Sequence, residues 1–67
     1  MRKNFTLAKA TAKQILAAAE CLAEDMDNAE TEDDLFSIRL RAEIINRAIA
    51  RLESINTATL EGRTFED

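Results

Sequence analysis

Apolar residues recur along this chain at steps of three and four, the spacing that places side chains on one face of an α-helix. Between residues 35 and 52, one such line comprises Leu35, Ile38, Ala42, Ile45, Ile49 and Leu52. A second line steps by four on a nearly opposite side of the same helix: Phe36, Leu40 and Ile44. A hairpin of two helices can bury only one of these lines, so the pattern predicts a second surface that covers the other.

The first part of the chain carries a heptad pattern in which small residues alternate with larger ones. Its members are Phe5, Ala8, Ala12, Ile15, Ala19, Leu22, Met26 and Ala29. This alternation lets two helices approach closely and interdigitate. We therefore predict a first helix over residues 6–28, with Asn4 or Thr6 as its N-cap.

A helix start is marked clearly in the middle of the chain. Thr31 is followed by three acidic residues, and the pair Thr31 and Asp34 matches the capping-box pattern before an apolar run. Acidic side chains in a first turn are also favoured by the helix dipole. We therefore predict a turn at residues 28–31 and a second helix over residues 32–59.

The only glycine, Gly62, is a natural helix stop, and residues 62–67 form a polar tail in which Phe65 either folds back or stays loose. Because a short link joins antiparallel neighbours, the predicted fold class is all-α, an antiparallel helical hairpin forming one domain over residues 1–67.

The composition predicts self-association. Ordering each residue costs about 1.5 kcal/mol, which one small core barely offsets. The chain has 67 residues, one cysteine and no histidine, so an internal disulfide is excluded and a zinc site is not indicated. We therefore predict a homodimer in which two hairpins form a four-helix bundle.

No arrangement of residues indicates catalysis. The sequence has no histidine, no tyrosine and no glycine-rich phosphate loop, and Cys21 has no basic neighbour that would activate its thiol. Asp25 and Asp27 have the opening spacing of a calcium loop, but Ala29, Glu30 and Phe36 occupy positions where that loop needs other residues. We expect no enzymatic activity, no catalytic residue, no cofactor and no metal.

Charge and hydropathy limit the other partners. The net charge of −4 disfavours nonspecific nucleic-acid binding, and no run has the length needed to span a membrane. A single cysteine and the lack of a secretion signal favour the reducing cytoplasm. We therefore expect a cytoplasmic protein without a membrane partner.

The second apolar line of the second helix is the candidate partner site. It continues toward two arginines and a further isoleucine, and its full membership is Phe36, Leu40, Ile44, Arg47, Arg51 and Ile55. Apolar and arginine side chains together are typical of protein interfaces. Either this line packs inside the homodimer or it binds a different protein. The favoured function is a small regulator or inhibitor that acts by binding another protein.

In the length and heptad style of both helices, the chain resembles the Rop type of plasmid-encoded helical hairpin, although no residue motif is shared. The resemblance implies an alternative function as an RNA-binding regulator, in which Arg39, Arg47 and Arg51 would contact RNA. In size, the chain also looks like accessory proteins of phages and other mobile elements, which often block a host protein. A structural or assembly subunit is the remaining alternative.

Overall fold

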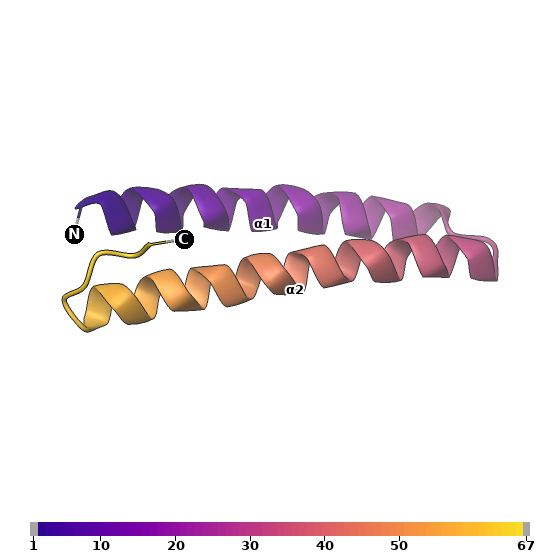
Figure 1. Ribbon diagram of the computed structural model, residues 1–67. Coiled ribbons are helices and arrows are strands. Elements are labelled where there is room, and N and C mark those ends of the chain that lie inside the picture. Colours follow the sequence, from indigo (N-terminus) through magenta and orange to yellow (C-terminus); the bar gives the residue numbers. More distant parts are fainter. Residues whose placement is uncertain (1, 67) are drawn as a thin grey trace.

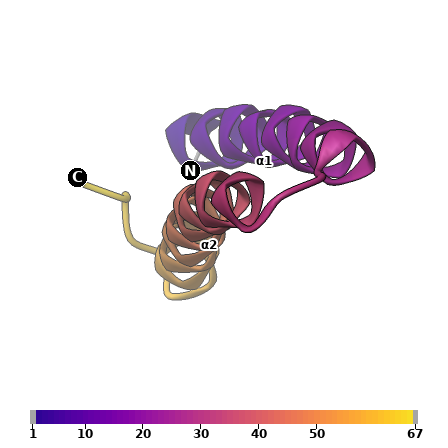
Figure 2. The same cartoon turned by 90° about the vertical axis from the view of Figure 1, so that its right-hand side faces the viewer.

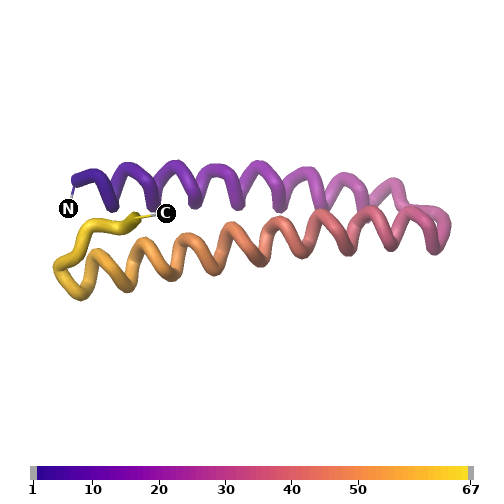
Figure 3. Tube along the Cα trace, viewed as in Figure 1, coloured from indigo at the N-terminus to yellow at the C-terminus, as the bar shows by residue number. Residues whose placement is uncertain are grey.

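The computed structural model, which describes residues 2–66, is a hairpin of two long antiparallel α-helices (Figure 1). Helix α1 spans Arg2–Asn28 and helix α2 spans Glu32–Leu60. The two helices lie side by side along their lengths, and the backbone trace folds back beyond α2 toward the start of α1 (Figure 3). The predicted all-α hairpin is confirmed, but α1 begins at Arg2 and not near residue 6.

The two residues considered as N-caps of the first helix are both inside it. The Thr6 hydroxyl donates a hydrogen bond to the Arg2 carbonyl at 3.1 Å. Asn4 is fully buried, and its amide side chain contacts the tail beyond α2. The cap assignment was wrong: both residues lie within α1, and the side chain of Asn4 bonds the tail instead of the first turn of the helix.

The predicted cap of α2 is confirmed. Thr31 has extended backbone angles of φ −130° and ψ 166°, and its hydroxyl accepts a hydrogen bond from the Asp34 amide at 3.3 Å. In return, the Asp34 carboxylate accepts hydrogen bonds from the backbone amides of Glu30 at 2.9 Å and Thr31 at 3.1 Å. These bonds hold the pKa of Asp34 below its ordinary value of 3.8, because they favour the charged carboxylate.

Helix α2 ends in a left-handed turn at Gly62, whose φ is +74°. The Gly62 amide donates to the Thr59 carbonyl at 3.1 Å, and the Arg63 amide donates to the Ala58 carbonyl at 2.8 Å. This pair of bonds is the Schellman motif, which satisfies the last helix carbonyls and reverses the chain. The predicted stop is confirmed, and it turns the tail back toward α1.

The two helices contact each other along one side of each, in a line of side chains that we call the seam. Figure 2 shows the pair from the end that carries the link. On α1 the buried or half-buried residues of the seam are Asn4, Ala8, Thr11, Ile15, Ala18, Leu22 and Asp25, and Ala29 continues this line in the link. On α2 they are Ile38, Ala42, Ile45, Ala48, Leu52 and Ile55. The buried Thr11 hydroxyl donates to the Leu7 carbonyl at 2.8 Å, so it can enter the seam without an unsatisfied polar group.

The seam uses only half of the heptad pattern predicted for the first helix. Four of its members lie in the seam, and four remain exposed on its flank: Phe5, Ala12, Ala19 and Met26. On α2, Leu35 and Ile49 are exposed in the same way. The apolar stripe of each helix is therefore wider than the surface that the other helix covers.

Candidate protein-interaction surfaces

The first candidate surface lies on α2, away from the seam. Phe36, Leu40 and Ile44 have exposed fractions of 62%, 63% and 62%, and Arg47, three residues after Ile44, is also exposed. At a rise of 1.5 Å per residue, the three apolar side chains extend over roughly 12 Å of helix. We call Phe36, Leu40, Ile44 and Arg47 the outer stripe.

Two residues predicted to continue this stripe lie elsewhere. Ile55 is fully buried between the helices, and Arg51 is half-buried with its guanidinium 5.5 Å from the centre of the Phe65 ring. Each step of four residues rotates the side chain by about 40° around the helix. Two steps of four beyond Arg47 therefore turn the line by about 80°, which brings Arg51 to the edge of the seam and Ile55 into it, and the exposed part ends near Arg47.

The second candidate surface was not expected as such, because sequence reasoning placed most of its residues between the helices of one hairpin and Leu16 on a wider bundle face. Its large side chains are exposed as follows: Phe5 56%, Leu16 60%, Met26 49%, Leu35 49% and Ile49 39%. We call these five residues, together with the exposed Ala12 and Ala19 and the half-buried Ala42 at the edge of the seam, the apolar face. The signal that could have revealed it is the width of the two apolar stripes, which exceeds what one neighbouring helix covers.

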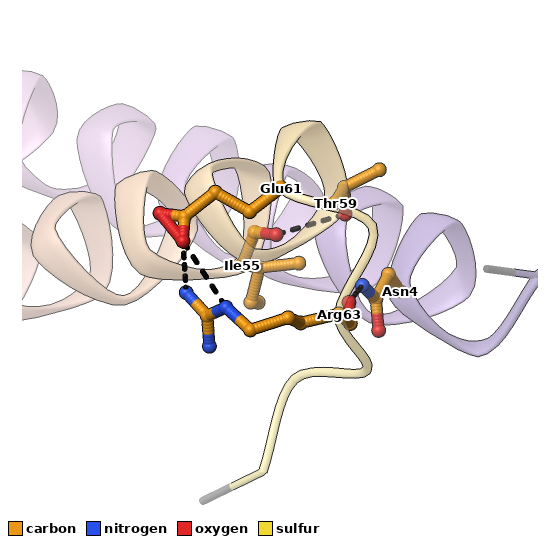
Figure 4. Close-up of polar contacts among 5 residues, drawn as sticks. All are labelled: Asn4, Ile55, Thr59, Glu61 and Arg63. Atoms are coloured by element: carbon orange, nitrogen blue, oxygen red, sulfur yellow. Dashed lines mark hydrogen bonds and ion pairs between the residues drawn. The ribbon is translucent and has the colours of Figure 1, made fainter.

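On another side of the hairpin, the tail is attached to α1 through Asn4 (Figure 4). The Asn4 amide donates to the Arg63 carbonyl at 2.7 Å, and its side-chain oxygen accepts from the Phe65 amide at 2.9 Å. The Arg63 guanidinium also pairs with the Glu61 carboxylate at 2.8 Å. Sequence reasoning did not find this attachment, because nothing in the local pattern distinguishes Asn4 from a helix cap.

Beside the tail is a hollow of about 590 Å³. It is lined by Ala50, Glu53, Ser54, Thr57 and Ala58 of α2 and by residues 63–66 of the tail. Polar and small side chains dominate this lining. The hollow lies where the tail passes beside the end of α2.

The structure also bears on metals and membranes. Within residues 2–66, no three histidine, cysteine, aspartate or glutamate side chains gather closely enough to hold a metal ion. Neither described helix has a stretch that is apolar and long enough to cross a bilayer.

The Asp25 carboxylate pairs with the Arg41 guanidinium at 2.9 Å across the hairpin, and both side chains are 44% exposed.

Comparison with known proteins adds no relative to these observations. No protein-family model, no curated protein and no solved structure matches this chain.

Proposed function

We propose that this chain is a small non-enzymatic regulator or inhibitor, acting in the cytoplasm, that binds another protein through the outer stripe of α2. The observation that carries this proposal is the exposure of Phe36, Leu40 and Ile44, each more than three-fifths accessible. Large side chains aligned on a surface lose unfavourable contact with water when a partner covers them. A contiguous apolar line on a helix therefore supports a binding role.

The spacing of the stripe supports one kind of partner. Apolar side chains four residues apart are the anchors by which a helix lies in an apolar groove of another protein. Arg47 follows the anchors at the end of the stripe and carries a positive charge toward the same surface. The fitting partner is a protein with an apolar groove and an acidic residue at its rim, because opposite charges fix orientation and register.

We also propose that two chains pair into a four-helix bundle. The only fully covered apolar residues within the described chain are Ile45, Ile55 and Ala58. A core of that size supplies little of the free energy needed to order the chain. Pairing of two hairpins would cover further apolar surface, and sedimentation at micromolar concentration tests it.

The test of the binding site is the variant Leu40→Glu, with Ala17→Glu as its matched control. Both changes place a carboxylate on an exposed helix position, but Ala17 lies on α1, outside the outer stripe. Each tagged protein is incubated with a bacterial lysate, and the captured proteins are identified. We expect one protein to be captured by the native chain and by Ala17→Glu and to be lost with Leu40→Glu, because a charge would have to be desolvated in the groove.

Circular dichroism and sedimentation of the same variant test the competing interpretation. If Leu40→Glu lowers the melting temperature and dissociates the dimer before a partner is added, the outer stripe is the contact between copies. The proposal requires that the helical content, melting temperature and oligomeric state all stay unchanged.

RNA binding in the manner of Rop is the second candidate, supported by the exposure of Arg39 and Arg47 on α2. Titration of the native chain with paired RNA loops at two salt concentrations distinguishes it. Binding that weakens steeply with salt, and weakens further with Arg47→Ala, would favour RNA. We expect no saturable binding, because the chain carries a net charge of −4.

A further inference from the structure

We infer that the apolar face is covered by a second copy of this chain, with the two hairpins antiparallel and their links at opposite ends. In this arrangement α1 lies against α1 of the second copy and α2 against α2. The inference rests on the proposed pairing and adds the face, the orientation and the residues in contact. It also assigns the outer stripe to a different partner.

The residues of the apolar face lie on one side of the hairpin. Met26 and Leu35 line the same hollow beside the link, so their two helices present them to a common side. Steps of seven residues stay on one side of a supercoiled helix. Met26 leads in this way to Ala19, Ala12 and Phe5, and Leu35 leads to Ala42 and Ile49.

The opposite side carries the tail. Asn28 and Ser37 line a separate hollow there, and steps of seven from Asn28 reach Cys21 and Gln14. One such step from Ser37 reaches Ile44 of the outer stripe, and two reach Arg51, whose guanidinium covers the ring of Phe65 in the tail. The tail therefore leaves the apolar face open to a second copy.

The face has layers that fit a reversed copy of itself. The short link places Met26 at the height of Leu35, Ala19 at the height of Ala42, and Ala12 at the height of Ile49. In the antiparallel dimer, the two-fold axis crosses the helices at the level of Leu16. Ala19 then lies opposite Ala12 of the second copy, and Ala42 lies opposite Ile49 of the second copy. The alanine pair lets the two α1 helices approach closely, because both side chains are small. The pair of alanine and isoleucine lets the two α2 helices interdigitate, because a small side chain leaves room for a large one.

Charges at the borders of the face also fit the antiparallel orientation. The border of α1 carries Arg2, Lys9, Leu16, Ala23 and Glu30 at steps of seven, and the border of α2 carries Glu32, Arg39, Asn46 and Glu53. In the antiparallel dimer, Arg2 lies against Glu30 of the second copy, and Arg39 lies against Glu53 of the second copy. Each of these contacts occurs twice because the dimer is symmetric. Leu16 then meets its own equivalent at the symmetry axis.

The parallel orientation, with both links at one end, is less complementary. It would pair Lys9 with Glu53, but it would place Glu30 against Glu32 and Leu16 against Asn46. Like charges at the border of two helices oppose pairing. The hairpin already has an ion pair of the favourable kind across its own seam, between Arg41 and Asp25 at 2.9 Å.

The size of the face is adequate for a dimer. The hairpin measures 47 by 15 Å between Cα atoms, so one side covers on the order of 700 Å², close to the ~800 Å² that each partner buries in a standard interface. The pairing leaves the outer stripe of each copy uncovered. The dimer would therefore offer two equivalent sites to the partner protein.

Distances between spin labels test the orientation. Cys21 is replaced by Ser, and a label is attached to Glu20→Cys or to Asp27→Cys, two exposed positions one heptad apart on α1. Reversal about Leu16 separates the two labels along the axis by about 12 Å at position 20 and about 33 Å at position 27. We expect the measured distance to be longer at position 27 by roughly 20 Å, whereas a parallel dimer gives nearly equal distances.

A charge exchange tests the border contact. Arg39→Glu and Glu53→Arg alone each place like charges together, so each should raise the dimer dissociation constant about tenfold at low salt. The double variant restores opposite charges in the antiparallel dimer and should return the constant to within about threefold of the native value. Lys13→Glu, an exposed change outside the face, is the control and should have no effect.

Four outcomes would overturn the inference. Sedimentation of the native chain as a folded monomer at all accessible concentrations would remove both the proposed pairing and the arrangement. A dimer with equal label distances, or a double variant as weak as the single ones, would remove the arrangement alone. A dimer broken by Leu40→Glu but not by Ala12→Glu would move the contact to the outer stripe.

Discussion

Replacement of Asn4 by alanine is the sharpest test of how the tail is held. Asn4 is fully buried, and its side chain bonds two backbone groups that lie 59 and 61 residues away in sequence. The substitution removes the amide that donates to the Arg63 carbonyl and the oxygen that accepts from the Phe65 amide. Both backbone groups must then return to water, or stay buried without a partner.

The expected cost follows from these two hydrogen bonds. Each contributes about 0.5–1.5 kcal/mol net to stability, so their loss costs roughly 1–3 kcal/mol. Alanine is a better helix former than asparagine by about 0.5 kcal/mol, which offsets part of that loss. We expect a net decrease of about 1–2 kcal/mol in the free energy of unfolding, a lowering of the melting temperature by roughly 4–16 °C for a domain of this size.

Chemical denaturation at one fixed protein concentration measures this decrease, and hydrogen exchange locates it. Exchange of the Phe65 amide should accelerate in Asn4→Ala. Asn28→Ala, which removes an exposed bond to the Glu24 carbonyl at 3.1 Å, should leave that amide unchanged. In a chain that ends at Gly62, Asn4→Ala should lower the free energy of unfolding by less than about 0.5 kcal/mol, because the Arg63 carbonyl and the Phe65 amide are no longer present. A cost that persists in the shortened chain, or an unchanged Phe65 amide, would refute the reasoning.

Three further changes test the ends of α2. Thr31→Ala should lower the free energy of unfolding by about 1 kcal/mol through loss of the cap, with the oligomeric state unchanged in sedimentation; an unmoved thermal transition would contradict this. The pKa of Asp34 is lower in the folded chain, so its stabilising contribution is present above pH 3.8 and is lost as the pH falls through the folded value. Denaturation at several pH values from 7 to 2 measures the difference in the free energy of unfolding between the native chain and Asp34→Asn. This difference should become smaller as the pH falls, and a constant difference would exclude a stabilising role of the Asp34 carboxylate. Gly62→Ala should cost about 1 kcal/mol in a thermal melt, because φ is +74° there and a side chain is strained in that region although no atom lies near its Cβ; a variant as stable as the native chain would argue against the left-handed turn.

Local chemistry along the sequence determined that there are two helices, and it determined both ends of α2. Apolar residues at steps of three and four predicted two helices, and the structure contains both. Thr31 and Asp34 were recognised as a capping box, and Gly62 as a stop, because each of these features depends on residues within a few positions of one another. Such short-range preferences act before any distant contact forms, so the sequence alone is sufficient to predict them.

The tertiary structure decided which part of each apolar stripe is covered. Thr11 and Ala12 are adjacent in sequence and belong to two neighbouring lines along the same helix. The periodicity of apolar residues does not say which of the two lines faces the other helix. Thr11 enters the seam because its hydroxyl bonds the Leu7 carbonyl, and Ala12 is left exposed. Asn4 was expected at a helix cap and is buried because its partners arrive from the other end of the chain. Ile55 was expected outside and is inside because a line of four-residue steps rotates toward the seam. Which side chains are covered depends on contacts between the two helices and between α1 and the tail, and only the folded chain brings these segments together.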